Sequence, residues 1–121
     1  NMRGRGYGRI VNISSINGRK GQFGQTNYAA AKAGILGLTK SLALENAGKC
    51  VTVNAICPGY VDTEMTASMR DDVREAIINQ IPAGRLGTAQ EIAEAAVFMA
   101  CARASFITGA TLDANGGQYM A

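Results

Sequence analysis

Apolar runs rich in β-branched residues recur along the chain and predict three strands. Residues 9–14 (Arg-Ile-Val-Asn-Ile-Ser) form the first run, residues 51–56 (Val-Thr-Val-Asn-Ala-Ile) the second, and residues 110–114 a shorter third. The first run shows little alternation of apolar and polar positions, which is typical of a strand buried on both faces of a parallel sheet. The pattern therefore favours an α/β protein.

The segment between the first two strands predicts one long helix over residues 27–46. Ala, Leu and Lys dominate this segment, and its apolar residues recur at helical spacing until Ala47-Gly48, which can end the helix. Strand, helix and strand in this order form a βαβ crossover, which requires a parallel sheet with helices packed on its faces. Before the helix, the glycine-rich residues 16–24 predict a loop.

The C-terminal part of the chain predicts a lid followed by a final helix. Residues 62–87 contain short amphipathic segments and loops, and we interpret them as a lid rather than as part of the core. Thr88-Ala89-Gln90-Glu91 is a capping-box pattern, which predicts a helix running to about Ala102. No internal repeat or low-complexity linker divides residues 1–121.

Composition and charge exclude several classes of protein. Hydrophobic residues make up 47% of the chain and the mean hydropathy is +0.01, values that argue against disorder. The net charge is +3, and the basic residues near the start alternate with glycines rather than with stacking aromatics. No apolar run reaches the length of a membrane span, and residues 1–6 do not resemble a signal sequence. We therefore expect neither a nucleic-acid nor a membrane partner.

The cysteines and the missing histidines exclude further kinds of site. Cys50, Cys57 and Cys101 are odd in number and show no Cys-x-x-Cys pairing, and the chain contains no histidine. Neither a disulfide framework nor a metal site is therefore expected, and a reducing cytoplasm fits the composition best. Cys57 also lacks a histidine that could act as its base, so a small residue ending a buried strand explains it better than a nucleophile.

A tyrosine and a lysine four residues apart on the predicted long helix provide the main chemical signal. Tyr28 and Lys32 share one face of that helix, and a nearby ammonium group favours the ionised phenol. Tyr28 is thereby a usable proton donor. Ser15, at the carboxyl end of the first strand, can hydrogen-bond the oxygen that Tyr28 protonates, so the two hydroxyls would polarise a carbonyl for hydride attack. By itself, Tyr-x-x-x-Lys is more often a solvated helix face.

Four stretches of sequence place these three residues in the context of a known family. They are residues 9–15 (Arg-Ile-Val-Asn-Ile-Ser-Ser), 27–34 (Asn-Tyr-Ala-Ala-Ala-Lys-Ala-Gly), 53–59 (Val-Asn-Ala-Ile-Cys-Pro-Gly) and 107–117, from Ile-Thr-Gly to Asn-Gly-Gly. Together they resemble the short-chain dehydrogenase/reductase family over nearly the whole chain. The resemblance implies an α/β fold, the C-terminal half of a Rossmann-like doubly wound parallel sheet, with a βαβ crossover, lid helices, and a final helix and strand. Residues 1–121 would then form a partial domain, the catalytic half.

The same resemblance implies a role for each matching residue. Ser15 would orient the keto group, Tyr28 would donate the proton, and Lys32 would tune Tyr28 and hold the nicotinamide ribose. The nicotinamide and its neighbouring phosphate would be framed, beside Tyr28 and Lys32, by Pro58, Gly59, Val61 and Thr63. The thioester end of the substrate would be contacted, beside Ser15, by Gln22, Gln25 and Tyr60, with Phe23 as a wall of the pocket. For the substrate residues, a purely structural role as loop polar groups and packed rings is an equal alternative.

Two subgroups of the family share the most sequence with this chain. Residues 22–28 and 58–60 resemble NADPH-dependent acetoacetyl-CoA reductases, whereas residues 81–87 and 116–120 resemble 3-oxoacyl-acyl-carrier-protein reductases. The first subgroup matches better, so the implied reaction is reduction of a 3-oxoacyl thioester, with acetoacetyl-CoA as the expected substrate and the acyl-carrier-protein thioester as the alternative, to the (R)-3-hydroxyacyl thioester. The implied cofactor is NADPH, with NADH as an alternative because the residues that select between the two have no counterpart here.

The Gly-rich turn that binds the dinucleotide phosphates in this family has no match in the chain. We expect a truncated enzyme, a half that pairs with a separate N-terminal half, or a stand-alone relic that assembles through an exposed sheet. A homo-oligomer is expected in each case, because sheet edges and a helix face of small residues suit assembly. The full-length family is typically tetrameric. The hypothesis from another class is a non-catalytic oligomeric fragment.

Overall fold

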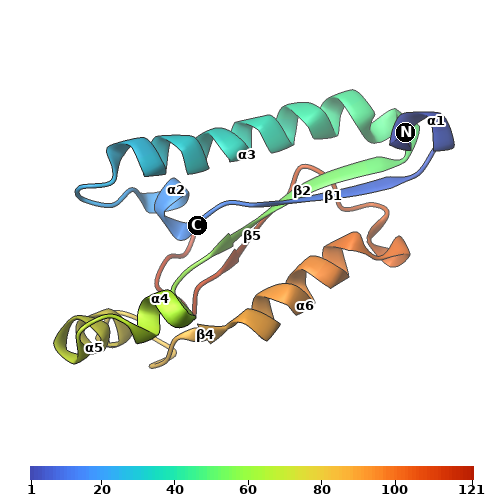
Figure 1. Cartoon of the computed structure of the whole chain (residues 1–121). Helices are drawn as coiled ribbons and strands as arrows, with labels where there is room; N and C mark the ends of the chain where they lie inside the picture. Colours follow the sequence, from blue (N-terminus) through green and yellow to red (C-terminus); the bar gives the residue numbers. More distant parts are fainter.

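A computed structural model describes residues 1–121 and shows a layered α/β arrangement (Figure 1). The central layer is a sheet of three parallel strands, β1 (Gly8–Ile13), β2 (Val51–Pro58) and β5 (Thr111–Ala114), in the order β1-β2-β5. β2 is paired on both sides, and its residues from Val51 to Cys57 are all buried, as expected of a central strand. The α/β fold with a parallel sheet is therefore confirmed.

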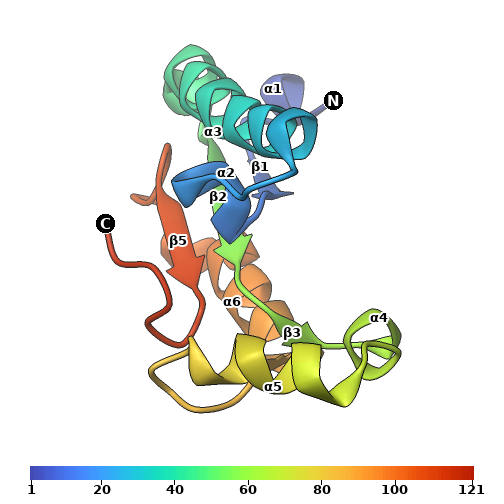
Figure 2. The same cartoon turned by 90° about the vertical axis from the view of Figure 1, so that its left-hand side faces the viewer.

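Helices cover both faces of this sheet. α3 (Thr26–Asn46) packs against β2 on one face, and α6 (Ala89–Ala100) packs against β1 and β2 on the other (Figures 1 and 2). α3 connects β1 to β2, so the βαβ crossover is confirmed. The apolar contact is concentrated where Ala43 of α3 meets Val51 and Val53 of β2. A parallel sheet with helices on both faces is the arrangement of a partial Rossmann-like fold.

A short helix, α2 (Ile16–Lys20), occupies residues for which the glycines predict a loop, so that prediction is wrong here. Ser15 caps this helix, because its hydroxyl oxygen accepts a hydrogen bond from the Asn17 backbone N–H at 3.1 Å. Gly18 lets α2 approach α3, since a Cβ atom at this position would lie 2.8 Å from the Lys32 carbonyl carbon. Gly18 therefore serves close packing rather than a turn.

The predicted lid lies at the end of the sheet where β2 ends. α4 (Glu64–Ala67) and α5 (Asp71–Asn79) protrude there from the three layers (Figures 1 and 2). A second small sheet closes the base of the lid, because β3 (Val61–Asp62) pairs in parallel with β4 (Gly87–Thr88). The predicted capping box of α6 is confirmed, although the helix ends at Ala100 rather than Ala102, since Cys101 is extended.

Three short helical segments complete the chain: α1 (Met2–Arg5), η1 (Ala47–Lys49) and η2 (Ala102–Ala104). No helix combines the length and the apolar character that crossing a membrane requires. Large apolar side chains remain exposed along the β1 edge, on α6 and in the connection to β5: Tyr7, Ile13, Val97, Phe98 and Phe106.

Candidate active site

A cleft of about 410 Å³ lies where β1 and β2 end, and the lid forms one of its walls. Its lining includes residues from each of the three predicted groups, catalytic, cofactor-binding and substrate-binding: Ser15, Gln25, Tyr28, Gly59, Tyr60, Val61 and Thr63. Parallel strands present the residues that follow them at one edge of the sheet, which is where ligands of such folds bind. The fold thus brings together residues that are far apart in the sequence.

Ser15 follows β1 and is held in place by the start of α2. Its side chain is largely buried, and its oxygen accepts the hydrogen bond from the Asn17 backbone N–H. A serine hydroxyl has one donor hydrogen in addition to its acceptor lone pairs. The Ser15 O–H therefore stays available to donate a hydrogen bond to a ligand in the cleft.

Tyr28 and Lys32 lie on successive turns of α3. Tyr28 lines the cleft with 43% of its surface exposed, and the Lys32 Nζ atom lies 5.7 Å from the centroid of the Tyr28 ring. The same ammonium group donates a hydrogen bond of 3.3 Å to the carbonyl oxygen of Ile13, the last residue of β1. This bond keeps the ammonium group of Lys32 beside the Tyr28 ring.

The predicted substrate residues divide into two groups. Gln25 and Tyr60 line the cleft, and the Gln25 Oε1 atom accepts a hydrogen bond of 2.9 Å from Asn17 Nδ2. Gln22 and Phe23 lie outside the lining, on the connection between α2 and α3. Gln22 Oε1 accepts a 3.4 Å hydrogen bond from Lys20 Nζ, and the Phe23 ring is fully exposed. A substrate role for Gln22 and Phe23 stays a prediction.

The predicted cofactor residues follow β2. Gly59, Val61 and Thr63 line the cleft, whereas Pro58 is the last residue of β2 and lies outside the lining. Lys32 uses only one of its three N–H donors, on Ile13, so two remain for other acceptors. Lys32 is not part of the cleft lining, but its ammonium group lies 5.7 Å from the centroid of the Tyr28 ring, which is, and its free donors suit the hydroxyl groups of a ribose. The donor set therefore fits the nicotinamide-ribose end of a dinucleotide.

Several cleft residues were not anticipated from the sequence: Ile16, Asn17, Met65, Thr66 and Met69. Met65 and Met69 are four residues apart in the lid, which is a helical same-face spacing that could have indicated a shared wall. Asn17 is nine-tenths buried, and its Oδ1 atom has no hydrogen-bond partner. The lid gives the cleft a wall with apolar side chains, while α2 gives it a polar one.

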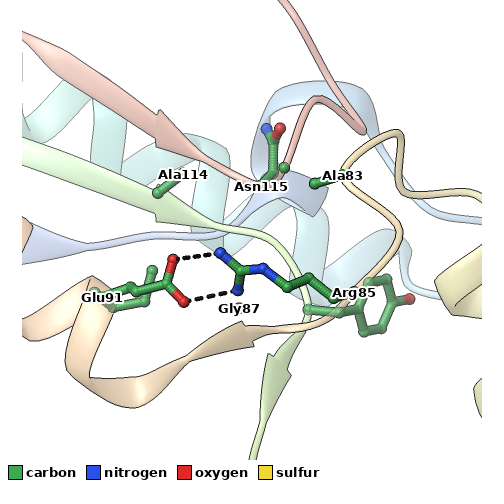
Figure 3. Close-up of a pocket in the computed structure, with 9 residues that line it drawn as sticks. Ala83, Arg85, Gly87, Glu91, Ala114 and Asn115 are labelled. Carbon is green, nitrogen blue, oxygen red and sulfur yellow. Dashed lines mark hydrogen bonds and ion pairs between the residues drawn. The ribbon is translucent and has the colours of Figure 1, made fainter.

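A smaller cavity of about 240 Å³ shares Tyr60 with the cleft. Figure 3 shows Arg85 and Glu91 facing each other beside it, joined by two hydrogen bonds of 2.8 Å and 3.0 Å. Hydrogen bonds from Arg85 and Thr88 lower the pKa of Glu91 to about 2. Because each charge is neutralised by the other, we assign the pair to the base of the lid rather than to a binding site.

Two further groups beneath the cleft have perturbed acidities. A hydrogen bond to the Asp113 carboxylate raises the pKa of Arg19 above its usual value. Burial raises the pKa of the Cys57 thiol, which is fully enclosed in β2. Cys57 therefore packs as a small protonated side chain, in agreement with its interpretation as a structural residue.

A parallel α/β sheet with serine, tyrosine and lysine meeting at its carboxyl edge defines the class of short-chain dehydrogenases/reductases. The family described as enoyl-(acyl carrier protein) reductase matches residues 1–118, and the chain belongs to this family of short-chain dehydrogenases/reductases. The family assignment predicted from the four sequence stretches is thereby confirmed.

Individual members of the family can be compared with this chain directly. The chain is 64% identical over 121 residues to an acetoacetyl-CoA reductase of Rhizobium meliloti, covering 99% of this chain and 50% of that protein. It is 63% identical over 119 residues to the acetoacetyl-CoA reductase of Shinella zoogloeoides, covering 98% and 49%. Identity to the 3-oxoacyl-acyl-carrier-protein reductase of Vibrio harveyi is 55% over 113 residues, covering 93% and 46%. The chain spans about half the length of the curated relatives it matches.

Proposed function

We propose that the full-length protein containing this chain reduces a 3-oxoacyl thioester with NADPH, converting acetoacetyl-CoA to (R)-3-hydroxybutyryl-CoA. One observation carries the proposal: Ser15 and Tyr28 line the same cleft, and the Lys32 ammonium lies 5.7 Å from the centroid of the Tyr28 ring. The choice of acetoacetyl-CoA is supported by the two relatives of that name, at 64% and 63% identity.

Ser15 and Tyr28 act together on the oxygen of the 3-keto group. The Ser15 O–H, whose oxygen is already engaged by the Asn17 N–H, donates a hydrogen bond to that oxygen and fixes its position. As negative charge develops on the keto oxygen, Tyr28 transfers its phenolic proton to it. The keto group thereby becomes a hydroxyl, and a phenolate is left on Tyr28.

Lys32 stabilises this phenolate by its positive charge. Its hydrogen bond to the Ile13 carbonyl oxygen orients the ammonium group, so that the charge need not be reorganised during proton transfer. The two remaining ammonium donors would bind the ribose hydroxyls of the cofactor. A reduced nicotinamide bound in the cleft supplies the hydride to the keto carbon. Gly59, Val61 and Thr63 would flank it, and Pro58 would shape the turn.

A substitution of Tyr28 tests the proposal directly. In the full-length protein, Tyr28→Phe removes the proton donor but keeps the ring, so kcat/KM for acetoacetyl-CoA should fall by at least about 100-fold. Loss of NADPH absorbance measures the rate, and the melting temperature measures the fold. Tyr7→Phe, at an exposed ring on the opposite end of the sheet, is the matched control and should keep the full rate. Near-normal turnover by Tyr28→Phe would refute the proposal.

The second candidate is reduction of the same 3-oxoacyl group on acyl-carrier protein. It is favoured by the relative from Vibrio harveyi that carries this name, at 55% identity. Gln25 and Tyr60, which line the cleft, would contact the thioester in both cases, together with Gln22, and Phe23 would form a wall of the pocket. Rates measured side by side on acetoacetyl-CoA and on acetoacetyl-acyl-carrier protein decide between the two. A preference for the carrier substrate would replace the first candidate by the second.

A candidate from another class is a non-catalytic oligomeric scaffold. Titration of the 121-residue chain with NADPH, and separately with NADH, tests it, because saturable binding would count against a non-catalytic fragment.

We propose a homo-oligomer in either case, and a tetramer for the full-length protein. This is supported by the exposed β1 edge and by the exposed small residues of α3, Gly34 and Gly37 among them. A cytoplasmic location fits the free cysteines and belongs to the same proposal.

A further inference from the structure

We propose that the ion pair between Arg19 and Asp113 is a positioning pair that sets the Ser15 hydroxyl for catalysis. The proposal rests on the proposed reductase function. It adds two residues that lie outside the cleft lining and that no sequence motif singles out.

The pair has the geometry of a rigid connection. Arg19 Nε donates to Asp113 Oδ1 at 3.1 Å, and Arg19 Nη2 donates to Asp113 Oδ2 at 3.0 Å. Both side chains are about four-fifths buried, with 22% and 18% of their surface exposed, and the Tyr119 ring lies 5.4 Å from the guanidinium carbon. Two parallel hydrogen bonds fix both the distance and the angle between the groups, and partial burial limits screening by salt.

This connection acts on Ser15 through α2. Ser15 is the N-cap of α2, and Arg19 lies in the last turn of the same helix. A helix of five residues has no independent stability, so its contacts with the rest of the protein decide where it lies. A shift of α2 would move the Asn17 N–H, and the Ser15 hydroxyl that is hydrogen-bonded to this N–H would move with it.

α2 is held from two sides, and Arg19 provides the side that faces β5. On the other side, Gly18 packs on the Lys32 backbone and Asn17 binds Gln25 of the segment leading into α3. Asp113 stands in register with Cys57 of β2, two residues before Gly59 in the cleft. The pair therefore ties Ser15 to the strands that also place the turn after β2.

The test uses the full-length protein and acetoacetyl-CoA. Asp113→Asn weakens the two parallel hydrogen bonds to Arg19. We expect kcat to fall about tenfold while KM changes less than about twofold, because the displaced Ser15 hydroxyl acts on the reacting oxygen. Arg19→Lys keeps the charge but loses the paired donors, and it should lower kcat in the same way. Asp72→Asn is the control, since the exposed pair of Arg70 and Asp72 has the same two parallel hydrogen bonds but lies outside the cleft lining.

A double-mutant cycle separates positioning from a general loss of structure. In a Ser15→Ala background, Asp113→Asn should cause no further loss of kcat, because the group that it positions is gone. The inference is overturned if kcat is unchanged in both Asp113→Asn and Arg19→Lys. It is also overturned if Asp113→Asn lowers kcat by the same factor in the Ser15→Ala background as in the parent protein. If the parent protein reduces no 3-oxoacyl thioester, the proposed function itself fails and the inference fails with it.

Discussion

The Ser14 hydroxyl donates a hydrogen bond of 2.6 Å to the carbonyl oxygen of Lys32. Ser14 is buried at the end of β1, directly before Ser15, and Lys32 lies on α3. One hydrogen bond between groups with no proposed chemical role therefore joins the strand that presents the serine to the helix that presents the tyrosine and lysine. The spacing of the three proposed catalytic residues depends on this junction as well as on their own side chains.

Ser14→Ala should lower both stability and rate. Loss of one buried hydrogen bond costs about 1 kcal/mol of unfolding free energy. Because the junction loosens, kcat on acetoacetyl-CoA should fall by about tenfold. Urea denaturation and steady-state kinetics of the full-length protein measure the two effects. Ser41→Ala, at an exposed position of the same helix, is the control and should change neither. A Ser14→Ala protein with parental stability and rate would show that the junction is dispensable.

Gly18→Ala should displace α2 from α3. The added Cβ atom would lie 2.8 Å from the Lys32 carbonyl carbon and 2.9 Å from the Ala33 nitrogen, and neither backbone atom can turn aside as a flexible side chain could. We expect a loss of about 1–3 kcal/mol in unfolding free energy together with a lower kcat.

Gly48→Ala is the matched control for this substitution, because no heavy atom lies within 4 Å of the added Cβ. Its unfolding free energy should stay within about 0.5 kcal/mol of the parent. Equal behaviour of the two alanine variants in urea denaturation would contradict the close approach of α2 and α3.

The strands and the long helix could be predicted from the sequence because their signal is local. β2 is mostly apolar and β-branched since both of its faces are buried, and α3 is a run of 21 residues dominated by the strong helix formers Ala, Leu and Lys. α2 could not be predicted, because five residues with a central glycine carry no period and depend on packing against α3.

The cleft residues also divide into those that the sequence indicates and those that depend on packing. Ser15, Tyr28 and Gly59 lie in motifs at the ends of elements, and the fold brings them to one edge of the sheet. Asn17 and Met69 line the cleft only because of where α2 and the lid lie, which is a property of tertiary packing. Arg19 and Asp113 are 94 positions apart, and no pattern in either segment indicates the partner.

Cys50→Gly should stabilise the protein. Cys50 is the one non-glycine residue with a positive φ, 56°, in the left-handed conformation that follows η1. Relief of that strain is partly offset by the greater backbone freedom of glycine in the unfolded chain, which leaves a gain of about 0.5–1 kcal/mol. Thermal unfolding under reducing conditions measures it. Cys50→Ala removes the thiol but keeps the strain, so a gain as large in Cys50→Ala would contradict this explanation.

Glu91→Gln should reduce stability in a pH-dependent way. The Glu91 pKa is lowered from 4.5 to about 2 by its hydrogen bonds to Arg85 and Thr88, so the stabilising contribution is complete above pH 4.5 and lost as the pH falls toward 2. The melting temperatures of Glu91→Gln and parent should differ most above pH 4.5 and converge near pH 2. The pair is exposed, so added salt should shrink the difference. Asp72→Asn is the control from another exposed pair. A difference independent of pH would indicate that the loss comes from the helix cap alone.

Gly34→Leu should separate the stability of one chain from its assembly. Gly34 is exposed on α3, and an added Cβ would meet no heavy atom within 4 Å, so a single chain has room for the larger side chain. If α3 packs against the same helix of a second copy, a leucine there fills the space that small residues leave for close backbone approach. The mass of the full-length protein in sedimentation equilibrium should then fall below that of the parent, while helix content stays unchanged.

Glu45→Gln, on the same helix and also exposed, should leave the mass unchanged. An unchanged mass for Gly34→Leu would contradict a contact between copies through α3, and the exposed Val97 and Phe98 of α6 would be the next surface to test.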